Sequence, residues 1–285
     1  MNGSTSTSSL PAALPVHVIE PARGLVPVQL KEIWEYRDLA YLLAWREIKI
    51  RYKQTALGVA WAVLQPLVAT LVFTLFFGRL AGLPSDGLPY PVFTFAALLP
   101  WQLFAYALSE SSNSVVNNQR VITKVYFPRL IMPIAAVCVG VADFVCSFAV
   151  LVAMLAYYGV APGWAILTLP VWTLLALASA LSVGIWLSAI NVKYRDVRYT
   201  LPFVTQVWMI ATPVAYSSAL VPEAWRPLVA LNPMVGVVDG FRWALLGTAT
   251  FPGATLLVST GAVLLLLVGG LFYFRSVERT FADIV

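Results

Sequence analysis

Residues 164–190 read WAILTLPVWTLLALASALSVGIWLSAI and contain no Asp, Glu, Lys or Arg. About 20 apolar residues in an α-helix cross the roughly 30 Å hydrocarbon core of a bilayer, so this stretch is long enough to span one. Five further stretches meet the same criterion: Leu57–Phe77, Tyr90–Leu108, Leu130–Tyr158 (apolar as far as Val160), Tyr199–Val221 and Thr255–Phe274. We therefore predict an all-α membrane protein with six transmembrane helices.

The composition of the whole chain excludes a water-soluble globular protein. Of the 285 residues, 60% are hydrophobic and 11% are charged, and the mean hydropathy is +0.82. Soluble domains have about 45–50% apolar and about 25% charged residues. This chain therefore has too few charges to cover a surface in water, and we expect most of its surface to face lipid.

The distribution of basic residues indicates the orientation of the spans. With six spans, all 18 Lys and Arg except Arg79, Arg226 and Arg242 fall on one side of the membrane. Cytoplasmic loops carry an excess of Lys and Arg, so we expect both termini to be cytoplasmic. The net charge of +5 does not require a nucleic-acid partner, because the basic residues flank spans and face anionic lipid.

A seventh apolar stretch, Leu228–Leu246, is a weaker candidate for a span. It contains Pro233, Asp239 and Arg242, and a crossing would bury two charges and a helix breaker in hydrocarbon. We therefore predict a re-entrant or interfacial hairpin in this part of the chain.

Two segments precede the first span. Residues 1–29 are rich in Ser, Thr and Pro, lack the organisation of a signal peptide and are expected to form a flexible cytoplasmic leader. Leu30–Lys53 has charges at both ends and a short apolar centre, which predicts a helix in the cytoplasmic interface with Trp34, Tyr41 and Trp45 at headgroup depth. Such a helix is either a membrane anchor or a docking surface for a partner. The expected organisation is a leader at 1–29, an interfacial helix at 30–54 and a transmembrane domain at 55–285.

The segment Ser111–Phe127 mixes polar and apolar residues, lacks Gly and is stopped by Pro128. This pattern favours a short amphipathic helix projecting from the membrane over an irregular loop. A membrane protein that is driven from outside the bilayer needs a rigid lever of this kind, and a plain loop is the alternative interpretation.

The sequence lacks the motifs of the common catalytic sites. It has no G-x-x-x-x-G-K-[ST] for ATP, no H-E-x-x-H, no G-x-S-x-G and no carboxylate pair for sugar chemistry. Its single histidine, His17, lies in the leader, and Cys138 and Cys146 are two helical turns apart in one apolar run. We therefore expect no catalytic residue, metal site or cofactor in this chain.

Asp143 is the one acidic residue within the six predicted spans. An ionisable residue inside a membrane is by default a functional candidate, here for a proton relay. Its own span offers no Glu, His, Lys or Arg as a partner, so a hydrogen-bonded Asp that packs helices together is the competing interpretation.

Four stretches together resemble a known family: WREIKIRYKQTALGVAWAVLQP (45–66), LPWQLFAYALSESSNSVVNNQRVITKVYFPRLIMP (99–133), NVKYRDVRYTLPFVTQVWMIATPVAY (191–216) and LNPMVGVVDGFRWALLG (231–247). Their order and spacing are similar to those of the ABC-2-type permeases of bacterial polysaccharide exporters, which carry O-antigen, capsule or teichoic acid. The resemblance covers nearly everything from Leu30 to the C-terminus and does not distinguish these cargoes.

The resemblance implies a homodimer in the bacterial inner membrane, paired with two copies of a cytoplasmic ATPase that binds ATP and Mg. It implies that Leu30–Lys53 touches the ATPase, that Ser111–Phe127 is a coupling helix, and that Pro222–Gly247 gates the outer side of the channel. The candidate coupling residues are Arg120, Lys124, Val125 and Tyr126.

The cargo that the resemblance implies is a polysaccharide on a polyprenyl pyrophosphate, whose anionic head needs bases at the cytoplasmic leaflet. At 100° per residue, Arg46, Lys49 and Lys53 share one helix face, just before Leu57 and Gly58, while Arg51 lies off that face. Sugars slide over flat aromatic faces, and the candidate channel aromatics are Phe73, Phe76, Phe77, Trp101, Phe104, Tyr106, Phe203 and Trp208. Many of these side chains could instead face lipid or pack helices.

Three other functions compete with polysaccharide export. An ABC-2-type efflux permease for a drug or lipid would share the class and change the cargo. A membrane-embedded polyprenyl-sugar transferase would need reactive loop residues or paired acids, which are missing. A proton-driven transporter would show several intramembrane ionisable groups and an internal repeat, and the chain has only Asp143 and no evident repeat.

Overall fold

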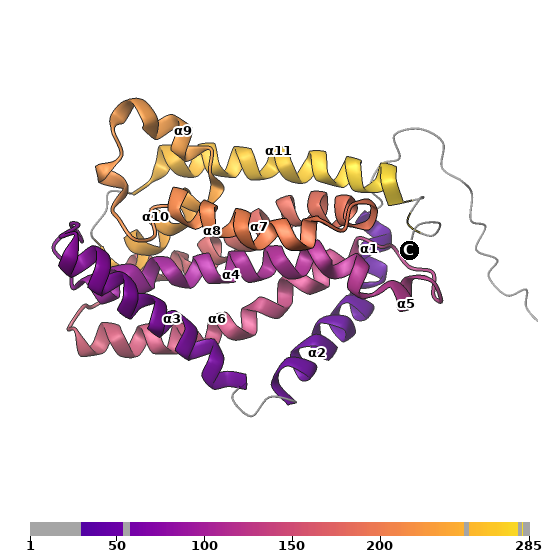
Figure 1. Cartoon of the computed structure of the whole chain (residues 1–285), viewed down its shortest axis with the longest axis horizontal. Coiled ribbons are helices and arrows are strands. Elements are labelled where there is room, and N and C mark those ends of the chain that lie inside the picture. Colours follow the sequence, from indigo (N-terminus) through magenta and orange to yellow (C-terminus); the bar gives the residue numbers. More distant parts are fainter. Residues whose placement is uncertain (1–29, 54–57, 248–250, 279–280, 282–285) are drawn as a thin grey trace, which may run out of the picture.

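The computed structural model describes residues 30–53, 58–247, 251–278 and 281. Within these residues the regular structure is helical, without a β-strand, and the helices form an elongated bundle (Figure 1). We name the two ends of the bundle after the short helices found there: the α5 end, with α5 (Gln119–Ile122), and the α9 end, with α9 (Arg226–Ala230). The predicted leader 1–29 and Leu57 lie outside the described residues.

Six segments connect the two ends of the bundle. They are α3 (Gly58–Phe73) continued by η1 (Thr74–Leu80), α4 (Tyr90–Asn117), α6 (Ile131–Tyr157), η2 (Trp164–Thr168) with α7 (Leu169–Lys193), α8 (Val197–Ala211) with residues 212–217, and α11 (Gly253–Val277). Among the described residues, five of these segments are long and apolar enough to cross a membrane: α3 with η1, α4, α6, η2 with α7, and α11. By the same measure the sixth candidate is the bent pair Glu223–Ala230 and Pro233–Leu246, whereas α8, with 15 residues, is shorter. The predicted all-α membrane fold is confirmed.

Helix α4 lies at the centre of the bundle and packs against α6 and α7. Its most apolar window is 78% buried, compared with 11% for α3 and 17% for α11. Gly184 of α7 lies against Ser111 of α4, where an added Cβ would collide with the serine side chain. Small residues at such crossings allow two helices to approach closely. Helix α4 is therefore the central helix of the bundle and runs from one end to the other.

The predicted interfacial helix consists of two pieces, α1 (Leu30–Glu35) and α2 (Arg37–Lys53). The break falls at Tyr36, whose carbonyl accepts from the backbone N–H groups of Leu39 and Ala40. Helix α2 packs against α6 through the buried side chains of Leu43 and Ala44. Arg46, Lys49 and Lys53 of α2 are exposed, whereas Arg51 is half-buried.

The structure corrects the prediction of a single helix over Ser111–Phe127. Helix α4 continues to Asn117, and α5 adds only one further turn. The Ser112 hydroxyl and the Asn113 amide donate to the carbonyls of Leu108 and Ser109, four residues earlier, so their polar groups are satisfied inside α4. Residues 123–130 then connect α5 to α6 without a regular helix.

The fifth pass also differs from its predicted bounds, Tyr199–Val221, because α8 ends at Ala211. The next residue, Thr212, is extended (ψ 138°), as expected before a proline, and Pro213 has no N–H to continue the helix. A helix of 15 residues is about 22 Å long, which is less than the hydrocarbon core. Residues 212–217 complete the pass in an irregular conformation.

A buried arginine of α10 (Pro233–Leu246) stabilises this irregular segment. The side chain of Arg242 is 3% exposed. It donates to three backbone carbonyls of the irregular segment, those of Pro213 (2.7 Å), Val214 (2.8 Å) and Tyr216 (3.1 Å). Its guanidinium also lies over the ring of Phe93, 3.6 Å from the centroid. Backbone carbonyls in an apolar bundle must find donors, and Arg242 supplies them where α8 has ended.

The hairpin formed by α9 and α10 is bent by 104° between the two helices. Asn232 holds the bend, because its side chain accepts from Trp208 (2.9 Å) and donates to Thr212 (2.9 Å). Val221 before the hairpin and Pro252 after it line the same cavity, so the chain enters and leaves at the α9 end. This is the geometry of a re-entrant hairpin.

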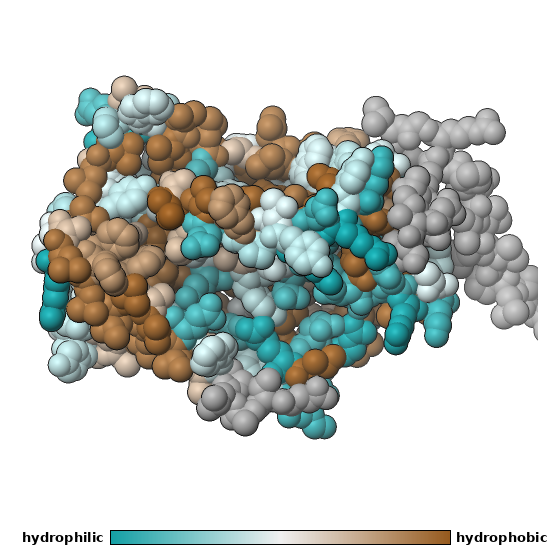
Figure 2. Space-filling view, in the orientation of Figure 1, coloured by the Kyte–Doolittle hydropathy of each residue, from teal (hydrophilic) through white to brown (hydrophobic). Residues whose placement is uncertain are grey.

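The surface of the bundle changes in character along its length. In Figure 2, hydrophobic side chains cover the part towards the α9 end, and hydrophilic side chains gather towards the α5 end. On α3 the exposed residues other than Gln65 are apolar, among them Trp61, Leu64 and Leu71. An exposed apolar surface of this kind is unfavourable in water, so lipid or another apolar partner must cover it.

Replacing Arg242 with Met should destabilise the fold strongly, because several buried carbonyls would lose their donors at about 1–3 kcal/mol each. We expect a loss of about 3 kcal/mol and an apparent Tm lower by about 6 °C or more. Arg242→Lys should restore only part of the loss, because an ammonium has no planar fork of donors. Thermal unfolding of the detergent-purified protein measures this, with Arg226→Met, at a side chain 52% exposed, as the control. Equal Tm values for both Met variants would contradict this role of Arg242.

Candidate functional site

One face of α2 presents three basic side chains at the α5 end. Arg46, Lys49 and Lys53 are exposed, as expected from their shared helix face. The Lys49 ammonium lies 5.6 Å from the centre of the Trp45 ring. Gly58, the first residue of α3, follows four residues outside the described part of the chain. The three bases therefore lie where α2 leads towards the first apolar pass.

Arg51 points away from this face and into the bundle. It forms an ion pair with Asp143 of α6, with 2.5 Å between Nη2 and Oδ2, and its guanidinium lies 4.4 Å from the centre of the Tyr106 ring. The Tyr52 hydroxyl donates to the other oxygen of Asp143. The hydrogen-bonded interpretation of Asp143 agrees with these contacts, although its partners come from α2 and not from its own span.

Asp143, Arg51 and Tyr52 form a cluster, the Asp143 cluster, which changes the pKa of the Tyr52 side chain. Burial and the hydrogen bond to Asp143 raise the pKa of the Tyr52 phenol above its ordinary range. The hydroxyl therefore stays protonated at neutral pH and remains a donor. Asp143 is thus held by one cation and one neutral donor, which fixes α2 against α6.

A cavity of about 370 Å³ opens beside this cluster. It lies between α3, α4 and α6, with Met209 of α8 contributing to one wall. Three of the predicted channel aromatics line it, Phe73, Trp101 and Tyr106. Its polar lining consists of Arg51, Gln65, Gln102, Asp143 and Ser147. The cavity therefore combines aromatic rings with amide, hydroxyl and paired charged groups, which is a lining suited to sugar rings.

The other five aromatic candidates lie elsewhere. Phe104 is fully buried and packs edge-on against Trp208, with 5.0 Å between the ring centres, so both belong to the core of the bundle. Phe76, Phe77 and Phe203 are exposed on the outer surface of this chain. These three would face lipid or a second copy, and none of the five lines the cavity.

The predicted coupling residues lie together in and after α5. Arg120, Lys124, Val125 and Tyr126 are all exposed. Val125 is 56% exposed and Tyr126 is 64% exposed, which leaves an apolar pair in an otherwise polar region. Phe127, the next residue, is buried and packs with Ile122 and Leu130, so the exposed pair is attached to a fixed base.

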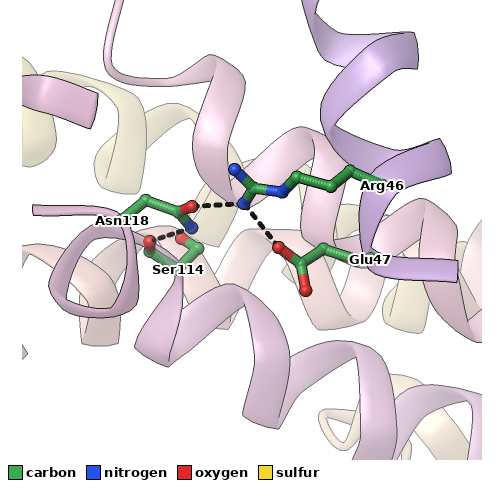
Figure 3. A network of polar contacts seen from close by, with 4 residues as sticks. All are labelled: Arg46, Glu47, Ser114 and Asn118. Atoms are coloured by element: carbon green, nitrogen blue, oxygen red, sulfur yellow. Dashed lines mark hydrogen bonds and ion pairs between the residues drawn. The ribbon is translucent and has the colours of Figure 1, made fainter. Parts of the chain in front are cut away.

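Three helices attach to the end of α4 just before α5. Arg46 of α2 donates to Asn118 (2.7 Å), which itself donates to the Ser114 carbonyl, and Arg46 also donates to Glu47 (Figure 3). Asn191 of α7 donates to the Ser112 carbonyl (3.0 Å). Arg198 of α8 donates to Asn117 (2.5 Å). The predicted head-group residue Arg46 is thus also a contact between α2 and the segment leading to α5.

The C-terminal part of α11 holds the other side of the α5 region. Arg129 donates through its backbone N–H to Glu278 (3.1 Å), and Arg275 forms an ion pair with the same carboxylate (2.7 Å). Phe281 is buried against Phe274. The segment between α4 and α6 is therefore fixed at both ends by polar contacts to other helices.

Sequence reasoning missed these polar contacts at the end of α4. The signal was present, because Ser111–Asn118 is a dense group of Ser and Asn directly after an apolar stretch. Their partners Arg46, Asn191 and Arg198 lie far away in the sequence, so the pairing could not be assigned. Among the residues described, no group of three or more His, Cys, Asp or Glu is placed to hold a metal ion.

Comparison with known proteins gives a consistent result. Residues 38–246 match the ABC-2 type transporter family. An O-antigen export system permease protein RfbA from Myxococcus xanthus is 32% identical over 89% of this chain and 98% of its own length. A protein of the same name from Klebsiella pneumoniae is 28% identical over 87% and 95%. The polysialic acid transport protein KpsM of Escherichia coli is 23% identical over 82% and 91%. The helical bundle described above therefore belongs to the ABC-2 type transporter family.

Proposed function

We propose that the chain is the channel-forming permease subunit of an ATP-driven exporter of a lipid-linked, O-antigen-like polysaccharide. The observation that carries this proposal is the end-to-end similarity to an O-antigen export permease, over 98% of that protein. The cavity lined by Phe73, Trp101 and Tyr106 supports it, since aromatic faces contact sugar rings without a fixed hydrogen-bond register. The polymer would move from the cytoplasmic side outwards.

The energy source is a separate ATPase, because the sequence has no P-loop. We infer two ATPase copies on a homodimer of this chain, with ATP and Mg bound by the ATPase. The α5 end carries nearly all described basic residues, which supports a cytoplasmic α5 end and cytoplasmic termini in the bacterial inner membrane. The exposed pair Val125 and Tyr126 supports ATPase docking there.

The exposed bases Arg46, Lys49 and Lys53 support recognition of the pyrophosphate head at the cytoplasmic leaflet. Each partly desolvated contact of a base with a phosphate contributes about 1.5–3 kcal/mol. Leu57 and Gly58 directly follow this face in the sequence and would border the head group. Arg51 is excluded from this set, because it is paired with Asp143.

Replacing Lys49 and Lys53 together with Gln should abolish most of the stimulation of ATP hydrolysis by lipid-linked polysaccharide, because two of three accessible bases are lost. The assay uses the permease–ATPase complex in nanodiscs with the cell's own lipid-linked polymer. The matched control is the double change Lys31→Gln with Arg37→Gln, in α1 and at the start of α2, distant in sequence from Gly58. A wild-type complex that the polymer does not stimulate would contradict the proposed function. Equal losses in both double variants would contradict head-group recognition.

Replacing Val125 and Tyr126 with Asp should uncouple the permease from its ATPase. The two side chains are exposed, so the fold should tolerate the change while the apolar docking surface is lost. We expect at least a tenfold loss of export at normal membrane levels of the permease, together with weaker co-purification of the ATPase. Tyr194→Asp is the control, since Tyr194 is an aromatic residue of similar exposure at the same end of the bundle. Normal export by the double variant would show that the segment after α5 is only a connecting loop.

The variant Asp143→Asn distinguishes ATP-driven export from a proton-driven mechanism. Asp143→Asn keeps the size of the side chain. Its amide oxygen can still accept from Arg51 and its amide N–H can donate to the Tyr52 hydroxyl oxygen, and the Arg51 side chain is already 36% exposed to solvent. We therefore expect Asp143→Asn to export normally, whereas Asp143→Leu, which loses both hydrogen bonds, should reduce the amount of folded protein. Surface polysaccharide and permease levels in the same cells are the measurements. Loss of export in a stable Asp143→Asn variant would revive the proton relay.

A further inference from the structure

A second cavity, of about 390 Å³, lies at the α9 end of the bundle, remote from the Asp143 cluster. Its walls come from the loop before α4, residues 217–221, the α9–α10 hairpin and the start of α11. Binding sites for small molecules have volumes of about 300–1,000 Å³, so one sugar residue of a polymer can be accommodated. None of the residues considered for the head group, channel or coupling lines this cavity.

The polar lining of this cavity carries balanced charge. Asp86 and Asp239 contribute two carboxylates, and Arg226 and Arg242 contribute two guanidinium groups. A bare cation would meet two arginines and an anion would meet two aspartates, so neither is favoured. A neutral ligand with many hydroxyl groups avoids both repulsions, because a hydroxyl can donate to a carboxylate and accept from a guanidinium.

The two carboxylates have acceptor capacity to spare among the described residues. Asp86 accepts from the Ser217 hydroxyl (3.1 Å) through Oδ2, and Asp239 accepts from the Ser218 hydroxyl through Oδ1. Each serine thus holds one oxygen of its carboxylate and leaves the other available. A carboxylate has about four lone-pair sites. Asp239 and Asp86 can therefore each accept further hydroxyl donors from a ligand in the cavity.

We propose that this cavity binds a neutral sugar residue of the exported chain on the extracytoplasmic side, with Asp86 and Asp239 accepting from sugar hydroxyls and Arg226 donating to sugar oxygens. The assignment rests on the proposed function for the cargo and for the orientation of the α9 end. It adds a sugar site on the side where the polymer leaves. The bound sugar would touch both the re-entrant hairpin and the start of α11.

The direct test measures sugar binding to the full-length protein in nanodiscs. Saturation-transfer NMR is recorded with a panel of methyl glycosides of neutral hexoses and 6-deoxyhexoses, with glycerol as the reference polyol. We expect at least one glycoside to bind, and the variant Asp86→Asn with Asp239→Asn to bind it about tenfold more weakly, because charge-assisted hydrogen bonds are lost. Asp196→Asn is the control, an exposed acidic residue directly before α8 at the opposite end of the bundle that does not line the cavity.

A second variant keeps the test decisive if the double Asn variant does not fold. Ala219 lies exposed at the rim of the cavity, so Ala219→Phe should fill the opening without disturbing the core and should also abolish glycoside binding. Binding no stronger than that of glycerol would overturn the proposal. Binding that needs CaCl2 and disappears with EDTA would overturn it in favour of a cation site.

An export assay in cells distinguishes a failure of the sugar site from a failure of the proposed function on which it rests. In the native host without its own copy of the gene, the wild-type chain should restore surface polysaccharide, and failure to do so would contradict the proposed function. With restored export, Ala219→Phe should lower surface polysaccharide at least fivefold. Leu220→Phe, at an exposed neighbouring residue that does not line the cavity, should leave it unchanged. Wild-type export by Ala219→Phe would overturn the sugar site alone.

Discussion

The contacts of Arg242 with the carbonyls of residues 213–216 are the interaction on which the rest of the α9 end depends. A bilayer provides no hydrogen bonds to exposed peptide groups, so a pass that stops being helical needs donors from the protein itself. The buried guanidinium provides them and is stabilised in turn by the Phe93 ring. Because the pass can end in an irregular segment, residues 217–221 can form one wall of the cavity beside the hairpin.

The same reasoning explains the contrast between the two ends of α4. At the α9 end its neighbours are held by Arg242 and Asn232, whereas at the α5 end Asn117, Asn118 and the Ser112 carbonyl bind α8, α2 and α7 separately. Side-chain amides at a partly exposed helix end contribute about 1 kcal/mol each. Contacts of this strength can be exchanged one at a time while the buried part of α4 stays folded.

The sequence was sufficient for features that depend on local composition. Spans such as Leu57–Phe77 and Thr255–Phe274 follow from length and the absence of charge, and helical spacing correctly separated Arg51 from Arg46, Lys49 and Lys53. It was insufficient where a distant residue decides the outcome. Pro213 marks the end of α8, but the irregular segment after it depends on Arg242 for its hydrogen-bond donors, and the partner of Asp143 is Arg51 in another helix. Composition also could not show that α4 would extend through Ser111–Asn117, because its polar side chains are satisfied within the helix.

Because Arg51 is paired with Asp143, the outer and inner faces of α2 differ in their electrostatics. On the exposed face of α2, Arg46 is paired with Glu47, whereas Lys49 and Lys53 are exposed and would attract the proposed pyrophosphate over about 8–10 Å at physiological salt. The inner face has an arginine that is already neutralised, and it lines the aromatic cavity. A pyrophosphate would gain little by entering the cavity, since the charge of Arg51 is already balanced by Asp143, whereas uncharged sugar rings need no counter-charge. Under the proposed function, the anionic head would therefore stay at the surface of α2 while the sugars that it carries occupy the cavity.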